Sequence, residues 1–325
     1  MDICPPFLLR KLKMSDFIYS DTNKHYHTQS CYLKKRFGRK TVKVSLNGNF
    51  TCPNRDGTKG VGGCTFCSAS GSGDFGGDPS VPIEVQFDEV RSKLIKKWGE
   101  PLYIPYFQAN TNTYGSIEKL RCLFEKALTL QNAVGLAVST RPDCISDEAA
   151  DYLEELSKRT YLVVELGLQT IHDKTAERLN RCHSYADFLR GYEMLSLRGI
   201  NVCVHIIDGL PDESREMMLE TTKAAASLRP HALKIHMLHI IKGTTLAEEY
   251  ENTPFSLLSA EEYASLVCDQ IEMMPPETII ERITGDGARS DLIAPRWTLD
   301  KKRVMNSIDL EFARRGTFQG DKFSL

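Results

Sequence analysis

Three cysteines in a glycine-rich stretch, Cys52, Cys64 and Cys67, are the residues of this sequence most suited to chemistry. The four glycines of TCPNRDGTKGVGGCTFC (51–67) allow a loop to wrap closely around a bound group. A structural zinc site needs a fourth ligand, such as Cys31 or a distant histidine, and a thioredoxin-type pair leaves Cys52 unexplained. Three thiolates are what a [4Fe-4S] cluster needs if one iron is to bind substrate or cofactor instead.

The composition excludes several other classes of protein. Of the 325 residues, 41% are hydrophobic and 26% are charged, as in an ordinary soluble fold. No segment approaches the roughly 18 consecutive apolar residues of a membrane helix, and the short apolar run 7–9 is too weak for a signal peptide. The remaining cysteines are scattered, as expected for reduced thiols. We therefore expect a cytoplasmic protein that has no contact with a membrane.

Short apolar segments alternate with amphipathic segments along most of the chain, which predicts a parallel sheet, either open or closed into a barrel. Working groups collect at the carboxyl ends of such strands, and the cysteine stretch follows the first strand. Ser116 and Ser146 are expected to cap their helices. The predicted strands are 41–47, 101–109, 133–140, 161–170, 201–210 and 232–241, and the predicted helices are 81–98, 116–130, 146–158, 185–198 and 213–228.

The regular alternation stops at about residue 242. Residues 256–274 and 299–316 have helical patterns, and ETIIERITG (277–285) has the pattern of a strand. We expect these elements to form an appendage that closes the side of the sheet rather than an independent domain.

The cysteine stretch, with Phe66 just before its last cysteine, resembles the cluster motif of the radical S-adenosylmethionine (SAM) superfamily. Eleven residues separate Cys52 from Cys64, where the common motif has three. Longer first spacings occur in the branch that resembles the catalytic subunit of elongator. Within that branch, FGRKTVKVSLNGNFTCPNRDGT, GSGDF and AP-x-W near Trp297 resemble a bacterial family of stand-alone proteins of about this length. Further landmarks of the branch are STRPD (139–143), VELGLQT (164–170), LNRCHS (179–184), HIIDGLPDE (205–213) and LKIHMLHIIKGTTLAEEY (233–250).

The resemblance implies an α/β fold, a partial (β/α)6 barrel of the radical SAM type with a short C-terminal α/β extension. It implies a basic N-terminal extension (1–36), a radical SAM core (37–250) and a C-terminal extension (251–325). It also implies two cofactors, a [4Fe-4S] cluster and SAM. An electron from the reduced cluster would split SAM into methionine and a 5'-deoxyadenosyl radical, which abstracts hydrogen from the substrate.

The resemblance also implies roles for individual residues, although it identifies no catalytic residue. Cys52, Cys64 and Cys67 would bind three irons, and Arg181 suits the carboxylate of SAM because a guanidinium pairs well with carboxylates. Ser139 could instead be a turn residue and Arg181 part of a surface ion pair. Further SAM contacts are expected from Phe66, Gln108, Glu165, Gln169, Asp208, Gly209 and Leu238, with Glu165 paired inside the cavity because an unpaired buried carboxylate is costly.

Three histidines in the last two predicted strands, His205, His236 and His239, read as hydrogen-bonded core residues rather than as catalytic groups. The net charge of -2 gives no global sign of nucleic-acid binding, but LKKRFGRKTVK (33–43) places a basic cluster just before the cysteine stretch. KLIKKW (93–98) and DKKR (300–303) add further basic clusters. We expect the first cluster to lie at the active face, where it could hold a phosphate backbone.

Relatives in the elongator branch act on the wobble uridine of tRNA, which makes tRNA the expected substrate. Only about 75 residues follow the recognisable core, so no acetyltransferase domain is expected, and no second cysteine cluster is present for sulfur insertion. The hypothesis is conversion of carboxymethylaminomethyluridine to aminomethyluridine, with flavodoxin or ferredoxin as the reductant. The alternatives are a radical SAM enzyme that acts on a small metabolite and a non-catalytic, zinc-stabilised module that binds RNA or protein.

Overall fold

The computed structural model describes residues 19, 20, 22–71, 76–285, 287 and 289–324. The apolar run 7–9 and most of GSGDF (71–75) lie outside these residues. Within the part of the chain that is described, no helix is long and apolar enough to cross a bilayer.

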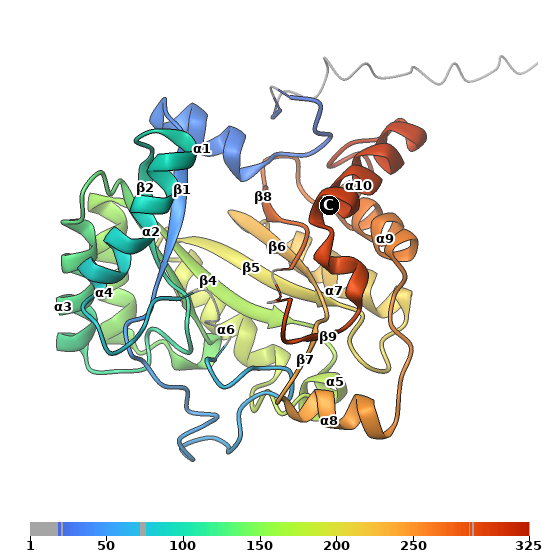
Figure 1. Cartoon of the computed structure of the whole chain (residues 1–325), viewed down its shortest axis with the longest axis horizontal. Helices are drawn as coiled ribbons and strands as arrows, with labels where there is room; N and C mark the ends of the chain where they lie inside the picture. Colours follow the sequence, from blue (N-terminus) through green and yellow to red (C-terminus); the bar gives the residue numbers. More distant parts are fainter. Residues whose placement is uncertain (1–18, 21, 72–75, 286, 288, 325) are drawn as a thin grey trace, which may run out of the picture.

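A single parallel sheet of seven strands organises the molecule, and its strands follow one another in chain order (Figure 1). A doubly wound sheet would reverse this order at a switch point, whereas a barrel-type sheet keeps it. The six predicted strands are all present, and ETIIERITG adds the seventh, which pairs in parallel with the sixth. The fold is therefore the expected partial barrel, lengthened by one strand. The strands are β1 (Thr41–Leu46), β2 (Leu102–Phe107), β3 (Gly135–Thr140), β4 (Tyr161–Gln169), β5 (Asn201–Asp208), β6 (Ala232–Met237) and β8 (Ile279–Arg282).

Helices between the strands cover the outer face of the sheet and bury its apolar side chains. The side chain of Ser116 accepts a hydrogen bond from the backbone N–H of Lys119, and that of Ser146 accepts one from Ala149, so both predicted N-caps are confirmed. The predicted helices correspond to α2 (Ile83–Trp98), α3 (Ile117–Leu128), α4 (Asp147–Arg159), α6 (Tyr185–Ser196) and α7 (Arg215–Ser227).

A second, smaller apolar cluster fills the interior of the partial barrel at the amino ends of the strands. Leu33 of α1 (Gln29–Phe37) packs there against Ile104 and Val163, with Tyr32 and Phe37 beside it. Helix α1, which the periodicity did not predict, therefore closes one end of the barrel interior. The carboxyl end stays available for a binding site.

The segment predicted as one strand from 232 to 241 divides into two. The last ladder bond between β5 and β6 joins the backbone N–H of Leu238 to the carbonyl of Asp208 at 2.9 Å, and β6 ends there. The chain then forms β7 (Ile240–Ile241), which pairs antiparallel with β9 (Leu292–Ala294). The two short helices α5 (Asp173–Arg178) and α8 (Thr245–Asn252) were also not predicted.

The C-terminal extension packs against the last strands of the sheet. Helix α9 (Ala260–Glu272) contacts α7, and α10 (Lys301–Arg315) contacts α9. In Figure 1 the segment between β8 and α10 crosses in front of the sheet. Both predicted C-terminal helices are present, and the strand between them belongs to the main sheet.

The basic cluster around residues 34–43 does not lie at the active face. Its exposed cations lie at the end of α1 or just before β1, whereas the cysteine loop follows the carboxyl end of β1. Figure 1 shows α1 at the top of the view and the loop at the bottom. The prediction is wrong because the whole length of β1 separates the two segments. Lys43, counted in that cluster, instead points inward and pairs with Glu165 and Glu281.

Candidate active site

A cavity of about 490 Å³ opens among the loops at the carboxyl ends of the strands. This volume lies within the roughly 300–1,000 Å³ typical of small-molecule sites. Most of the side chains predicted from the sequence meet there, although they come from segments more than 180 residues apart in the chain. The predicted residues that line the cavity are Cys52, Cys64, Phe66, Cys67, Gln108, Ser139, Gln169, Arg181 and Leu238.

Asp208 and Gly209, predicted to contact the nucleoside of SAM, are not among the lining residues. Asp208 is 2% exposed and accepts a hydrogen bond from Nε2 of Gln270 on α9 at 2.7 Å. The N–H of Gly209 points to the sulfur of Met218 at 3.1 Å. Asp208 is buried where Gln270 of α9 packs over the end of β5, whereas Gly209 is half-buried. Burial raises the pKa of Asp208 to about 7.

The cysteine loop is held by its own backbone and by the segment after α5. Asn54, fully buried, donates to the carbonyl of Asn180 and approaches the sulfur of Cys64 at 3.7 Å. In return, Nδ2 of Asn180 bonds the carbonyls of Val61 at 3.0 Å and Gly63 at 2.8 Å. A glycine at 63 suits its φ of +80°. The loop therefore has a defined shape before any ligand binds.

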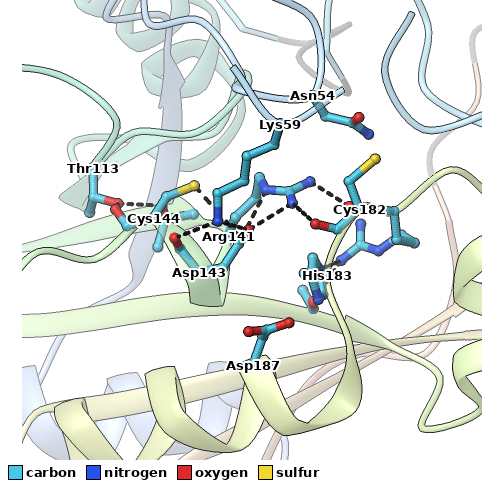
Figure 2. A network of polar contacts seen from close by, with 12 residues as sticks. Asn54, Lys59, Thr113, Arg141, Asp143, Cys144, Cys182, His183 and Asp187 are labelled. Atoms are coloured by element: carbon cyan, nitrogen blue, oxygen red, sulfur yellow. Dashed lines mark hydrogen bonds and ion pairs between the residues drawn. The ribbon is translucent and has the colours of Figure 1, made fainter. Parts of the chain in front are cut away.

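Two buried arginines connect this loop to the ends of β3 and β4. Arg141 bonds the carboxylate of Asp143 with Nε and Nη2, both at 3.0 Å, and the carbonyl of Arg181 at 2.8 Å. Lys59 reaches Asp143 from the cysteine loop at 2.6 Å. Figure 2 shows Arg141 between Asp143 and the backbone at Cys182, with Lys59 pointing toward the same carboxylate. Burial alone would raise the pKa of Asp143, but Arg141 and Lys59 lower it to about 2.

Arg181 lies beside the second cysteine rather than on the surface. Its Nη1 is 3.7 Å from the sulfur of Cys64, and its Nη2 bonds the carbonyl of Gly167 at 2.7 Å. A hydrogen bond from Cys67 holds the pKa of Cys64 well below its usual value, and Arg181 and Arg141 add to this effect against the opposing effect of burial. The surface ion pair considered for Arg181 is therefore wrong. We call Cys52, Cys64, Cys67, Arg141 and Arg181 the cysteine wall.

The opposite side of the cavity comes from β5, β6 and β8 and carries three histidines and two cations. We call these residues, His205, Lys234, His236, His239 and Arg282, the histidine wall. His205 bonds Glu165 at 2.8 Å, so the prediction of a hydrogen-bonded histidine is confirmed for it. It is wrong for His236 and His239, whose Nε2 atoms are buried without a partner among the described residues. The strand pattern could not distinguish these cases, because all three side chains face the same interior.

A buried ionic cluster lies below the histidine wall. Glu165, fully buried, accepts bonds from Lys43 at 2.6 Å and from the hydroxyl of Tyr106 at 2.6 Å, and it pairs with Lys234. Burial alone would raise the pKa of Glu165, but Lys234, Lys43 and His205 hold it well below its usual value. Glu165 is thus paired as expected, but as a support beneath the cavity, and it is not among the lining residues.

Sequence reasoning missed Arg141 and Asp143 although both lie in STRPD, because only Ser139 was assigned there. The sequence did contain a signal for them. An arginine that precedes an aspartate by two residues at the end of a predicted buried strand could have indicated a buried ion pair at the site. Among the described residues, no three His, Cys, Asp or Glu side chains converge closely enough to hold a single metal ion.

Comparison with protein families identifies the architecture. Residues 52–225 match the model of the radical SAM superfamily, beginning at Cys52, and residues 230–314 match the model of the radical SAM C-terminal domain. The protein YtqA of Bacillus subtilis is 48% identical over 312 residues, which cover 96% of this chain and 97% of YtqA.

More distant similarities extend to elongator-like proteins. A tRNA uridine(34) acetyltransferase of Methanocaldococcus infernus is 28% identical over 174 residues, which are 53% of this chain and 32% of that protein. The solved structure of Elp3 from the same organism, with an N-terminal deletion, has a TM-score of 0.62 at 20% identity and covers 86% of this chain and 64% of that one. At that identity the likeness concerns the fold. Both family models match, and the chain has the parallel sheet and the three cysteines at one cavity that the sequence predicted. The chain therefore belongs to the radical SAM superfamily of enzymes, which use a [4Fe-4S] cluster and SAM.

Proposed function

We propose that this radical SAM enzyme modifies the wobble uridine of tRNA and converts its carboxymethylaminomethyl group to an aminomethyl group. The observation that carries the tRNA assignment is the similarity, over 53% of the chain, to a protein named for its action on tRNA uridine 34. Membership of an enzyme superfamily removes support for the alternative of a non-catalytic zinc module.

The proposal assigns Cys52, Cys64 and Cys67 as ligands of the cluster. Their chemistry fits it, because thiolates are the ligands of iron-sulfur clusters and neighbouring groups favour the thiolate of Cys64. Three thiolates that bind three different irons do not need to converge on one point. When bound, the cluster and SAM supply a 5'-deoxyadenosyl radical that abstracts hydrogen.

The chain's own residues would then position SAM and exclude water. Arg181 and Gln169 lie side by side because Gly167 has no side chain, and a Cβ at that position would be 2.7 Å from Nε2 of Gln169. Gln108, held by a 2.9 Å hydrogen bond from Ser45, would face the methionine amine. Phe66 and Leu238, which belong to one apolar cluster, would contact the adenine. Ser139, at the end of β3, would contact the ribose or the carboxylate.

The proposed reaction balances without a further oxidant. Loss of the carboxymethyl group as glyoxylate consumes one water and removes two electrons and two protons from the substrate. Cleavage of one SAM to methionine and 5'-deoxyadenosine takes up two electrons and one proton, and one proton is released. Flavodoxin or ferredoxin would supply the initiating electron, which the substrate later returns. Glyoxylate is therefore a diagnostic product.

Nucleoside mass spectrometry of tRNA from a deletion strain tests the proposal. We expect carboxymethylaminomethyluridine to accumulate and aminomethyluridine to disappear. In a matched assay, the purified enzyme with SAM and this tRNA should release glyoxylate and 5'-deoxyadenosine in equal amounts. An unchanged nucleoside profile, together with SAM cleavage that does not respond to tRNA, would instead favour a small metabolite as the substrate.

A further inference from the structure

The cavity is lined by cations and has no carboxylate among its described lining residues. Arg55, Arg141 and Arg181 lie toward the cysteine loop, and Lys234 and Arg282 lie on the histidine wall. The two carboxylates nearest the histidine wall, Glu165 and Glu281, lie below it with almost no exposure, paired with Lys43 and Lys234. An anionic group is the ligand that such a cavity favours. The carboxylate of SAM is assigned to the cysteine side, so an anionic group at the histidine wall would have to come from another ligand.

His236 and His239 are the unusual groups of the histidine wall. Neither ring has a hydrogen-bond partner among the described residues, although both are largely buried. Burial lowers the pKa of His236 well below its usual value, and the nearby groups Arg282, His205, Lys234 and His239 lower it further. Burial, with Lys301 and Arg282, lowers the pKa of His239 to about 4. Both imidazoles are therefore neutral at physiological pH, and each has a nitrogen that can accept a hydrogen bond.

The local packing fixes these rings in place. The ring of His236 lies 5.5 Å from that of His205, which is itself held by Glu165. The ring of His239 occupies space next to Gly285, where a Cβ would come within 2.5 Å of its Cε1. Buried polar groups normally have partners, and a fixed, unpartnered ring in a cavity wall is suited to a ligand that completes its hydrogen bonds.

We propose that the histidine wall binds the carboxymethylamino end of the modified uridine, with Arg282 attracting its carboxylate and His236 and His239 accepting hydrogen bonds from its ammonium. This inference rests on the proposed function. The group is a zwitterion with the charges of glycine, so it needs a cation and neutral acceptors close together, as on this wall. The aminomethyl product has lost the carboxylate, so the same wall would favour its release.

The test is binding without turnover. The anaerobically prepared holoprotein, with SAM and no reductant, is titrated into fluorescent anticodon stem-loops that carry either carboxymethylaminomethyluridine or unmodified uridine at the wobble position. We expect the wild type to prefer the modified stem-loop by about tenfold or more. His236→Phe and His239→Phe keep a ring but remove its nitrogens, and each should reduce this preference to about twofold while affinity for the unmodified stem-loop is unchanged.

His172→Phe is the matched control, because His172 lies at the start of α5 and is not a lining residue. It should keep the full preference, and His236→Gln, which can still accept a hydrogen bond, should restore part of it if His236→Phe folds poorly. Preference retained by both phenylalanine variants, or absent in the wild type, overturns the inference. The nucleoside profile of the deletion strain distinguishes failure of this inference from failure of the proposed function. An unchanged profile contradicts the proposed function as well, whereas a profile changed as expected supports the proposed function even if this inference is wrong.

Discussion

The cysteine wall and the histidine wall face the same cavity but differ in how their polar groups are satisfied. On the cysteine wall, Arg141 and Arg181 are fixed by carbonyls and by Asp143. On the histidine wall, the Nε2 atoms of His236 and His239 are buried without partners among the described residues. An unpartnered buried group gains its first hydrogen bond when a ligand arrives, whereas a group that is already bonded gains less from the same ligand. The difference indicates which side is complete before binding and which side the substrate completes.

This difference also fits the two kinds of ligand. A cofactor used in every turnover benefits from a rigid, preorganised cradle, because no reorganisation is then needed during the reaction. A substrate that must be recognised and released benefits from contacts that it completes itself. We therefore expect mutations in the cysteine wall to affect cofactor content and mutations in the histidine wall to affect discrimination between substrates.

Replacement of Cys64 by alanine should have the largest effect. It removes one of the three proposed iron ligands, so iron content and SAM cleavage should fall to background. Cys268→Ala is the matched control, because Cys268 is a buried thiol that bonds the carbonyl of Ile308 at 3.6 Å, far from the cavity loops. It should retain iron and activity. Equal iron content in the two variants would mean that the cysteine loop is not the cluster site.

Replacement of Glu165 by glutamine tests the support beneath the histidine wall. It leaves the buried charges of Lys43 and Lys234 with Glu281 as their one remaining carboxylate among the described residues, so the free energy of unfolding should fall by about 3–5 kcal/mol in chemical denaturation. Glu154→Gln on the surface of α4, which pairs with Lys158, should change it by about 0.5 kcal/mol or less. Because the pKa of Glu165 is lowered in the folded state, the contribution of its charge is present above pH of about 4 and is lost in acid.

Replacement of Asp208 by asparagine tests a buried carboxyl group that is not among the residues lining the cavity. The pKa of Asp208 is raised from 3.8 to about 7, so the folded state binds more protons than the unfolded state between these values. Stability should therefore fall as pH rises from 4 to 7, by roughly 2–4 kcal/mol. Asp208→Asn should abolish this decline and be the more stable protein at pH 8. A parallel decline in both proteins would assign the pH dependence to another group.

Most of the fold was predictable from the sequence, and nine of the twelve predicted site residues line the cavity. The strands and outer helices have strong periodicity, and the cysteine spacing and STRPD lie at strand ends, where a parallel sheet concentrates its ligands. Contacts between distant segments were not predictable. Three such features depend on tertiary packing, which local patterns do not encode. They are the packing of α9 over Asp208, the position of α1 at the opposite end from the cysteine loop, and the inward direction of the Lys43 side chain.

Replacement of Lys59 by alanine should have the smallest effect, and it tests whether the cysteine wall is preorganised without its exposed ion pair. Lys59 is partly exposed and contributes one bond to the carboxylate of Asp143, which Arg141 already holds with two. Its loss should lower the free energy of unfolding by about 1 kcal/mol or less and leave iron content unchanged. Asn180→Ala, which removes the two bonds to the carbonyls of Val61 and Gly63, should reduce iron content clearly. If Lys59→Ala lost as much iron as Asn180→Ala, the cysteine wall would depend on a surface ion pair and would not be preorganised.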